Sequence, residues 1–351
     1  MRVLVAMSGG VDSSVAAALM RDQGHDVVGV TLKLWSGPNG EAPTAGCCTL
    51  SDAEDARRVA AKLDIPYYVL DYTEEFKDGV VDRFVTDYVT GRTPNPCIEC
   101  NRTVKFDRLL SSLDHFDTER LVTGHHARTV DNGGVRELRR GTDHAKDQSY
   151  VLSMLTQKEL SRTRFPVGEM TKERVREIAR DLDLRTANKP ESMDICFVGQ
   201  RDYRSFLRGH APDAFAPGPL VDTSGVEIGD HDGVVGFTIG QRRGLGVAVG
   251  EPRYVVDIQP STSTVVIGAR RDLRVGEVDL VEVTSVTGDR FDGAVSAQYR
   301  AHGEPVDAVL EGQRLVFDIP QEAVAPGQTV AFYDDDRVLG GAIIRRTHRS
   351  S

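Results

Sequence analysis

The first half of the chain alternates short apolar runs with stretches in which apolar residues recur at helical spacing. Runs of strand length occupy residues 2–7, 26–35, 67–72 and 120–124. Helical spacing is found over residues 12–24, 52–63, 74–90 and 103–113, and Ser51 with Glu54 is the expected capping box of the second helix. Strands that alternate with helices predict a doubly wound parallel sheet, which binds its ligand beyond the carboxyl ends of the strands.

The pattern changes after about residue 209. Glycine and proline become frequent, and short strands predicted at 254–259 and 264–268 flank the turn-like "PSTS". From about residue 273, alternating segments predict a small all-β barrel, with strands at 278–286, 294–300, 315–319, 329–333 and 339–346. The pattern therefore places domain boundaries near residues 209 and 273.

Composition is that of an ordinary globular chain. The 351 residues are 40% hydrophobic and 27% charged, and no stretch approaches the ~20 apolar residues of a membrane helix. No early segment resembles a signal peptide. Five cysteines, an odd number without an export signal, favour cytosolic thiols over a disulfide framework. We therefore expect a cytoplasmic protein that has no membrane partner.

The charge distribution does not favour a nucleic-acid partner at first sight. Net charge is −10, and the acidity is strongest over residues 275–336, whereas the middle of the chain is slightly basic. A nucleic acid would have to contact local arginine clusters, although such clusters are also common on solvated faces. The clusters are Arg136/Arg139/Arg140, Arg201/Arg204/Arg208, Arg242/Arg243 and Arg270/Arg271/Arg274.

The segment "SGGVDSS" (8–14) follows the first predicted strand and opens the first predicted helix. Its glycines let the backbone approach a phosphate, its serines offer hydroxyls, and the helix that follows presents unpaired N–H groups. The segment lacks the lysine of the GxxxxGK[ST] loop and the spacing of GxGxxG. Asp12 would suit a Mg²⁺ ion held jointly with phosphates. The sequence therefore predicts a phosphate-binding loop.

This segment resembles the PP-loop of the ATP pyrophosphatase superfamily, whose members adenylate a carbonyl oxygen and release pyrophosphate. The resemblance implies ATP and Mg²⁺ as cofactors. It does not identify the substrate, because GMP synthetase, argininosuccinate synthetase and tRNA-modifying enzymes share the loop. The residues that it implies for ATP are Ala6, Met7, Ser8, Gly9, Gly10, Val11, Asp12 and Ser13.

Longer segments resemble the tRNA-specific 2-thiouridylase family, which replaces the C2 oxygen of the wobble uridine with sulfur. They are "GRTPNPCIECNRTVKF" (91–106), "TGHHAR" (123–128), "KDQSYVLSML" (146–155), "KPESMDICF" (189–197) and "GFTIGQRRGLGV" (236–247). The resemblance covers nearly the whole chain in order. It implies a PP-loop ATP-binding catalytic domain over 1–208, a central domain over 209–272 and a tRNA-contacting β-barrel over 273–351.

The same resemblance assigns roles to individual residues. Cys100 is the implied nucleophile, and Cys196 is the implied carrier of a persulfide. Leu32 and Gly124 are implied at the nucleotide, and Asn95, Pro96 and Cys97 near the target base. Further tRNA contacts are implied for His125, Lys146, Asp147 and Gln148 near the site, and for Tyr299, Arg300 and Gln328 on the barrel.

Sulfur chemistry explains why two distant cysteines would be needed. ATP would adenylate uridine O2, and sulfur from a Cys196 persulfide would replace it with release of AMP and pyrophosphate. Breaking the persulfide with the Cys100 thiolate would leave a Cys100–Cys196 disulfide, which an external reductant resets. Arg102, Lys105 or a helix starting near Thr103 are candidates for lowering the thiol pKa. The expected partners are tRNA and a persulfide-donor protein, and the expected state is a monomer, because tRNA would cover much of the surface.

Other interpretations stay open at this point. A zinc site at Cys97 and Cys100 needs a second pair of ligands, and the adjacent Cys47 and Cys48 cannot supply the usual spacing. An iron–sulfur cluster could be held by Cys97, Cys100 and Cys196. A PP-loop synthetase that amidates or ligates a small molecule would need neither two reactive cysteines nor a barrel. A non-catalytic RNA-binding module would leave the ATP loop unexplained.

Overall fold

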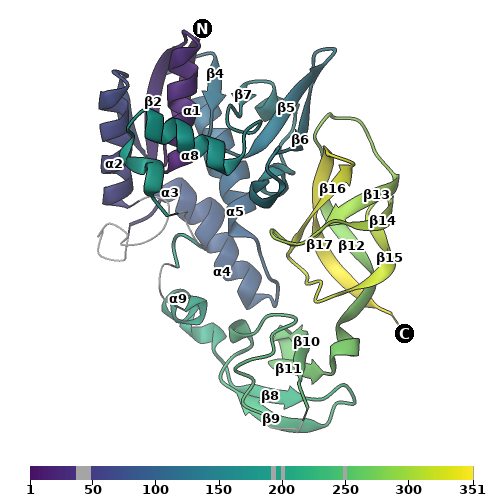
Figure 1. Cartoon of the computed structure of the whole chain (residues 1–351). Coiled ribbons are helices and arrows are strands. Elements are labelled where there is room, and N and C mark those ends of the chain that lie inside the picture. The colour runs from purple at the N-terminus through teal and green to yellow at the C-terminus, as the bar shows by residue number, and fades with distance from the viewer. Residues whose placement is uncertain (37–48, 191–194, 199–201, 248–250, 351) are drawn as a thin grey trace.

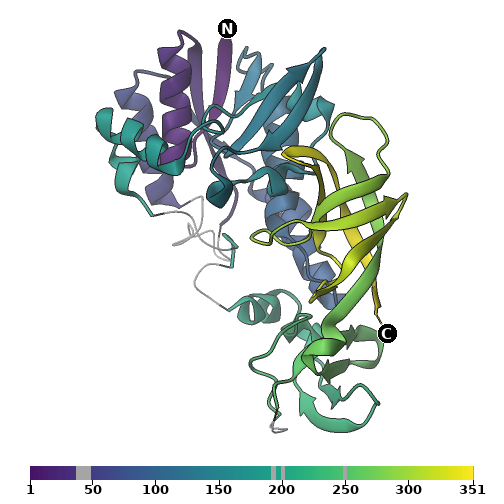
Figure 2. The same cartoon turned by 45° about the vertical axis from the view of Figure 1, so that its right-hand side comes forward.

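The computed structural model describes residues 1–36, 49–190, 195–198, 202–247 and 251–350. It contains a five-stranded, a four-stranded and an eight-stranded sheet. In Figures 1 and 2 these form a helix-covered sheet at the top, a small β domain at the bottom and a barrel at the side. The predicted fold class, a parallel α/β sheet followed by a small domain and a β-barrel, is confirmed. In the described part of the chain, no helix has the length and apolar character needed to cross a membrane.

The first sheet is parallel throughout, with strand order β3-β2-β1-β4-β7. Val3 and Val5 of β1 pack with the helices α1, α2 and α8, whereas Leu4 packs with the helices between residues 73 and 111. Alternate residues of a strand thus bury opposite faces of the sheet, as a doubly wound sheet requires. The elements are β1 (Arg2–Ala6), α1 (Val11–Asp22), β2 (Asp26–Lys33), α2 (Leu50–Lys62), β3 (Tyr67–Asp71), β4 (Arg120–Val122), α7 (Gln157–Leu160), β7 (Thr163–Arg164) and α8 (Lys172–Asp181).

The capping box of α2 differs from the predicted one. Thr49 is the N-cap residue: its backbone N–H and its hydroxyl donate to the Asp52 carboxylate, at 2.9 and 2.6 Å. The Asp52 N–H donates in return to the Thr49 hydroxyl, at 3.1 Å. Ser51 and Glu54 lie inside the helix, so the predicted Ser51/Glu54 box is wrong. A Thr-x-x-Asp pair satisfies the first N–H groups of a helix in the same way as the Ser-x-x-Glu pair does.

The cysteine-containing segment is already helical from Pro96 on, before the helix that was expected from residue 103. The helix begins at α5 (Pro96–Glu99), passes through the π-helical segment η2 (Cys100–Phe106) and ends in α6 (Asp107–Ser111). Asn95 caps it: its side-chain oxygen accepts from the N–H groups of residues 97 and 98, at 3.1 and 3.4 Å. The proline after it occupies the first turn, where its missing N–H costs nothing. The predicted start near Thr103 is therefore wrong, because Asn-Pro is itself a start signal.

The preceding helix is formed by three consecutive segments, also with a π-helical middle. They are α3 (Thr73–Phe76), η1 (Lys77–Val81) and α4 (Asp82–Val89). This confirms the helix predicted over residues 74–90.

The barrel has six antiparallel strands and closes through pairing of its first and last strands. Leu280, Ala297 and Phe332 are among its fully buried core residues. The sequence pattern missed the third strand. The strands are β12 (Arg274–Ser285), β13 (Gly293–Gln298), β14 (Val306–Glu311), β15 (Arg314–Glu322), β16 (Thr329–Asp334) and β17 (Arg337–Arg349).

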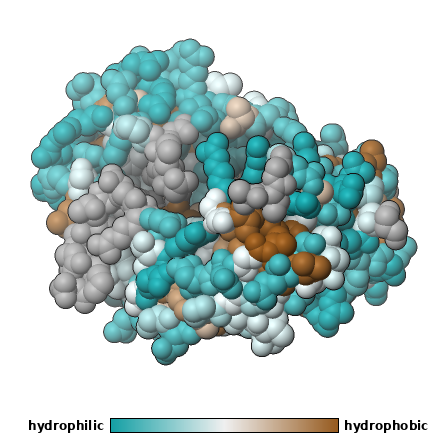
Figure 3. All heavy atoms as spheres, turned by 90° about the horizontal axis from the view of Figure 1, so that it is seen from below, coloured by the Kyte–Doolittle hydropathy of each residue, from teal (hydrophilic) through white to brown (hydrophobic). Residues whose placement is uncertain are grey.

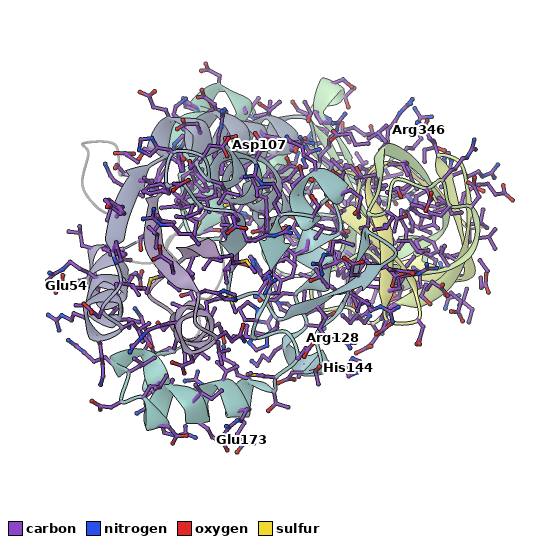
Figure 4. The ribbon with its side chains drawn as sticks, turned by 90° about the horizontal axis from the view of Figure 1, so that it is seen from above. Glu54, Asp107, Arg128, His144, Glu173 and Arg346 are labelled. Carbon is purple, nitrogen blue, oxygen red and sulfur yellow. The ribbon has the colours of Figure 1, made fainter. Side chains whose placement is uncertain are left out.

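A hairpin from the first half of the chain extends the barrel sheet. It consists of β5 (Ala127–Asn132) and β6 (Val135–Arg140), and β6 pairs with the start of β17. Asp336 accepts from Arg128 at 2.7 Å and from Arg139 at 2.9 Å. Figure 4 labels Arg128 on this hairpin, facing the barrel, whereas Glu54 and Glu173 lie at the outer rim. The hairpin ties the N-terminal part of the chain to the barrel.

The central part begins with α9 and continues as a four-stranded sheet of order β10-β11-β8-β9. Its elements are α9 (Tyr203–His210), β8 (Gly218–Val221), β9 (Glu227–His231), β10 (Tyr254–Gln259) and β11 (Thr264–Gly268). The two strands predicted here, 254–259 and 264–268, are confirmed. The face seen from below is mostly hydrophilic, with one compact hydrophobic area near its middle (Figure 3).

Candidate functional site

A cavity of about 290 Å³ opens at the carboxyl ends of β1, β2 and β4. This is the edge at which a doubly wound sheet is expected to bind its ligand. Every residue predicted at the nucleotide lines it except Gly9. The predicted lining residues are Ala6, Met7, Ser8, Gly10, Val11, Asp12, Ser13, Leu32 and Gly124.

At two positions beside the cavity, backbone segments approach so closely that only glycine fits between them. Gly9 has φ of +72°, and a Cβ there would lie 2.2 Å from the carbonyl oxygen of Asp52. A Cβ on Gly124 would lie 2.5 Å from the backbone nitrogen of Ser13. Both contacts are far shorter than atoms tolerate, so the loop can have this shape only with glycine at these positions.

The serine hydroxyls hold the loop together. Ser13 Oγ donates to the carbonyl oxygen of Gly10 at 3.2 Å and accepts from the backbone N–H of Ser8 at 3.1 Å. Ser14 Oγ donates to the same carbonyl at 2.7 Å. The loop is thereby fixed before a ligand arrives, with the N-terminus of α1 at the cavity wall.

Asp12 is held by two basic side chains. Lys172 Nζ donates to one carboxylate oxygen at 2.6 Å, and His126 Nε2 lies 3.0 Å from the other. Burial raises the pKa of Asp12, but the bonds to His126 and Lys172 outweigh it, so the pKa lies below its ordinary value. Lys172 is the first residue of α8 and is itself buried. The fold thus brings a lysine to a phosphate loop that contains none.

Lysines outnumber carboxylates on the described wall of the cavity. Lys189 Nζ donates to Asp52 and to Asp55, at 2.7 Å each. Four lysines and two aspartates line the cavity, namely Lys105, Lys146, Lys172, Lys189, Asp12 and Asp52. The excess of positive charge suits a polyphosphate. The apolar wall beside it, Val30, Leu32 and Leu34, suits a purine base.

The side chains that line the cavity do not by themselves form a magnesium site. Both lining carboxylates already accept hydrogen bonds from lysines. Across the described residues, no three His, Cys, Asp or Glu side chains gather as a metal site. The predicted Mg²⁺ therefore stays a prediction, and Lys172 is a cation that the fold itself supplies beside the loop.

His125 lines the cavity as a neutral ring. Its Nδ1 lies 2.7 Å from the Thr123 hydroxyl, and the rings of Phe106 and Phe165 lie 5.9 and 6.0 Å away. Burial, and to a lesser degree Lys105 and His126, lower the pKa of His125 to about 3. At neutral pH the ring offers hydrogen bonding and stacking but no charge for a phosphate.

The other residues predicted near the tRNA site divide into two groups. Lys146 and Gln148 line the cavity, and Gln148 Oε1 accepts from the backbone N–H of His126 at 2.9 Å. Asp147 does not line it: its carboxylate accepts from Ser149 and pairs with Arg140 at 3.1 Å. The position of Asp147 in the fold is therefore that of a structural anchor.

The cysteine helix lies beside the cavity lining without contributing its cysteines to it. Cys100 is buried and Cys97 is exposed on the same helix. Pro96 is also buried, and Asn95 caps the helix. Cys196 is half-buried, in a turn at residues 195–198, and packs against the apolar cluster that includes Cys100.

The expected Cys100–Cys196 disulfide has no support in the structure. The described cysteines are present as thiols, Cys100 within a packed helix and Cys196 in a turn. The residues flanking that turn, 191–194 and 199–201, lie outside the described part, as do Cys47, Cys48 and Arg201. Cys97, Cys100 and Cys196 do not gather as a metal-binding group among the described residues, so the geometry does not support the three-cysteine cluster.

The two cations predicted to activate Cys100, Arg102 and Lys105, have different surroundings. Arg102 is bound by Glu99 at 2.9 Å and by Glu282 at 2.7 Å, so its charge is neutralised. Lys105 instead lines the cavity. A π-helix has more residues per turn than an α-helix, which brings positions five apart closer to one face. Lys105 is therefore the better candidate.

The barrel residues predicted to contact tRNA lie apart from the cavity. Arg300 donates to the backbone carbonyls of Glu322 and Ala323, and Tyr299 OH lies 3.2 Å from Gln321 Oε1. Both line a separate open hollow on the barrel. Gln328 Oε1 accepts from the N–H of Ala325 at 3.2 Å and closes a turn.

Sequence reasoning missed several cavity residues. Nothing in the sequence marked Lys172 or Asp52 as a cavity residue, apart from their positions near helix starts. His126 had a signal, because it belongs to "TGHHAR", and Lys189 another, because it opens "KPESMDICF". Thr123 and Pro190 belong to the same two segments. The remaining missed lining residues are Val30, Thr31 and Leu34, whose types are common in any strand.

Models of three protein families match the chain in succession. A "tRNA methyl transferase HUP domain" matches residues 1–200, a "tRNA methyl transferase PRC-barrel domain" matches 204–269, and an "Aminomethyltransferase beta-barrel domain" matches 270–344. A solved 4-thiouridine synthetase–RNA complex with bound ATP is similar at 16% identity and a TM-score of 0.38, over 60% of this chain and 50% of that chain.

Full-length relatives are much more similar. The tRNA-specific 2-thiouridylase MnmA of Herpetosiphon aurantiacus is 45% identical over 350 residues, which cover 98% of each chain. The protein of that name from Carboxydothermus hydrogenoformans is 47% identical over 358 residues, again covering 98% of each chain. With this identity along nearly its whole length, the chain belongs to the tRNA-specific 2-thiouridylase family.

Proposed function

We propose that this protein is an ATP-dependent sulfurtransferase that converts the wobble uridine of tRNA to 2-thiouridine. The observation that carries the proposal is the lysine-rich cavity on the glycine loop, within a chain of this family. We place the catalytic domain at 1–208, the central domain at 209–272 and the barrel at 273–351. The partners proposed are tRNA and a persulfide-donor protein, and the proposed state is a cytoplasmic monomer.

The cavity residues fit the activation step. The backbone N–H groups of the loop and Lys172 are positioned to bind the phosphates, and the apolar wall with Leu32 is positioned to bind the base. Bound ATP supplies the adenylyl group that turns uridine O2 into part of a good leaving group. His125 and Gln148 would hold the uridine at this cavity as neutral hydrogen-bonding groups, since the low pKa keeps the imidazole uncharged.

The two cysteines fit the sulfur step. The terminal sulfur of a Cys196 persulfide attacks C2, and AMP departs with the oxygen. The Cys100 thiolate then attacks Cys196 Sγ, so the S–S bond breaks and its electron pair goes to the sulfur on C2. An external dithiol supplies two electrons and restores both cysteines as thiols. Asn95, Pro96 and Cys97 would position the base at the start of the cysteine helix, where Cys97 is exposed.

Cysteine variants and iron analysis test the proposal together. The protein is purified anaerobically, its iron and acid-labile sulfide are measured, and 2-thiouridine formation is assayed with unmodified tRNA, ATP and a persulfide donor. We expect active, iron-free protein, with thiolation abolished in Cys100→Ala and Cys196→Ala and partly retained in Cys97→Ala. Stoichiometric iron with equal loss in all three variants would instead establish a cluster mechanism. AMP formation without tRNA would indicate a small-molecule synthetase.

A further inference from the structure

Four charged side chains join the cysteine helix to the barrel, and we call them the arginine–glutamate cluster. They are Arg83 of α4, Glu99 of α5, Arg102 of η2 and Glu282 of β12. Glu99 directly precedes Cys100 and is buried, with 6% of its surface exposed. Its Oε2 accepts from Arg83 at 3.2 Å and from Arg102 at 2.9 Å. The residue beside the candidate nucleophile is therefore fixed by two arginines.

Glu282 of the barrel completes the cluster. Its two carboxylate oxygens accept from Arg83 at 3.1 Å and from Arg102 at 2.7 Å, so each arginine spans both glutamates. Burial raises the pKa of Glu282, but the two arginines outweigh it, so the pKa lies below its ordinary value. Glu282 is thus ionised at neutral pH and pairs with both arginines.

The backbone at Glu282 is strained. Its φ is +52°, in the left-handed region that is unfavourable for a residue with a Cβ. The register with β17 shifts between Val281 and Thr284, which pair with Ile343 and Gly341, so β12 contains one extra residue. This is a β-bulge, a device that redirects a side chain. Here the redirected side chain leaves its own barrel and binds another domain.

A second contact joins the same region to the barrel. The backbone N–H of Thr93, shortly before the cysteine helix, donates to the carbonyl oxygen of Pro326 at 2.8 Å. Gly327, with φ of +90°, packs so closely on Arg92 and Thr93 that a Cβ would lie 2.8 Å from Arg92. The helices α4 and α5 accordingly lie beside the barrel in both views (Figures 1 and 2).

We propose that Glu282 is a positioning residue for sulfur transfer. The bulge projects its carboxylate onto Arg83 and Arg102, and these hold Glu99 and with it the helical turn that carries Cys100. The barrel therefore sets the orientation of the nucleophile, in addition to any contact it makes with tRNA. This inference rests on the role proposed above for Cys100.

The test compares Glu282→Gln with Glu277→Gln. Glu277 lies on the same strand, but its ion pair with Arg314 stays inside the barrel, so it is a matched control. In Glu282→Gln we expect single-turnover thiolation to slow about fivefold, because the two partly exposed ion pairs of Glu282 are weakened. The KM for ATP and tRNA-dependent pyrophosphate release should not change, because no residue of the cluster lines the cavity. Glu277→Gln should behave like the wild type.

Thiol reactivity supplies a readout that a general loss of stability would not give. The alkylation rates of Cys100 and Cys196 are followed separately, by mass spectrometry of their peptides. In Glu282→Gln the rate at Cys100 should change about fivefold while the rate at Cys196 stays constant. A parallel change at both cysteines would mean general loosening and would overturn the proposal.

Glu282→Gly separates positioning from folding. Glycine has no penalty at this φ, so relief of strain offsets the lost ion pairs, and the thermal midpoint should stay within a few degrees of wild type while thiolation slows as in Glu282→Gln. If both Glu282 variants thiolate like Glu277→Gln, the proposal is wrong although the proposed function stands. If Cys100→Ala thiolates at the wild-type rate, the proposed function itself fails.

Discussion

At the scale of single residues, the cation beside the phosphate loop is supplied from a distant part of the chain. The loop "SGGVDSS" contains no lysine, yet Lys172 Nζ lies 2.6 Å from Asp12 within it. The ion pair with Asp12 orients this lysine toward the loop. A phosphate that arrives at the loop then meets a preorganised positive charge, which lowers the reorganisation needed in the transition state.

We expect Lys172→Met to slow tRNA-dependent pyrophosphate release by roughly 10²-fold, the scale on which a preorganised charge-stabilising group acts. Lys172→Arg should retain part of the activity. The measurement is single-turnover release of labelled pyrophosphate, with ATP binding determined in parallel. Lys158→Met is the control, because Lys158 forms an exposed ion pair with Asp107 away from the cavity.

Loss of Lys172 also leaves Asp12 partly buried with only one of its two basic partners, His126. The double variant Asp12→Asn/Lys172→Met should therefore be more stable than Lys172→Met but no more active. Recovery of activity in the double variant would show that the lysine serves only to neutralise Asp12.

At the scale of elements, short stretches of backbone place the chemistry. The turn from β1 into α1 is possible only because Gly9 adopts a left-handed conformation against the backbone of α2. The turn from Asn95 into Pro96 starts the cysteine helix early, and its π-helical middle then rotates Lys105 relative to Cys100. Each element exists for a local steric or capping reason and positions a functional group as a result.

We expect Gly9→Ala to destabilise the protein and to abolish ATP binding, because its Cβ would lie 2.2 Å from the Asp52 carbonyl oxygen. The matched variant is Gly10→Ala, since Gly10 has φ of −89° and its Cβ would meet only Ser8 Oγ, at 3.4 Å. Thermal unfolding without nucleotide checks this, and Gly9→Ala should have the lower midpoint. Equal midpoints for the two variants would show that the loop can rearrange.

At the scale of the whole molecule, the barrel is joined to the catalytic part by shared β-structure as well as by side chains. The β5–β6 hairpin adds to β17, and Asp336 holds Arg128 and Arg139 of that hairpin. The arginine–glutamate cluster forms a second link. These links, together with the contact between Thr93 and Pro326, restrict rotation of the barrel relative to the cysteine helix.

We expect Asp336→Asn to destabilise this junction by about 1–2 kcal/mol, because it weakens two charge-assisted hydrogen bonds. Asp334→Asn is the control, since Asp334 pairs with the nearby Arg337 of its own hairpin and is 64% exposed. Differential scanning calorimetry should show a lower midpoint, or separate transitions, for Asp336→Asn alone. Identical scans for both variants would mean that the contacts of Asp336 with the hairpin do not stabilise the junction with the barrel.

The sequence alone determined the fold class, the phosphate loop and the cysteine pair. Strand and helix periodicity are local properties of the chain. In "SGGVDSS", the glycines, the serines and the helix start that predict phosphate binding all lie within seven residues that follow a strand. The same local reasoning misjudged two helix starts, because Thr49 with Asp52 and Asn95 with Pro96 are start signals that competed with later ones. Assignment of the tRNA residues came from the family resemblance, and those roles stay predictions.

Only the tertiary structure decided which charged groups meet. Lys172 reaches Asp12 across 160 positions of the chain, and Glu282 reaches Arg102 across 180. No periodicity encodes such pairs, because long-range contacts depend on how the sheets and helices pack together. Arg139 and Arg140 of the β5–β6 hairpin belong to a cluster that the sequence analysis considered for nucleic-acid binding. In the structure they pair with Asp336 and Asp147 of the protein itself. Sequence fixes the elements through local sterics and burial, whereas the site is assembled by packing between elements far apart in the chain.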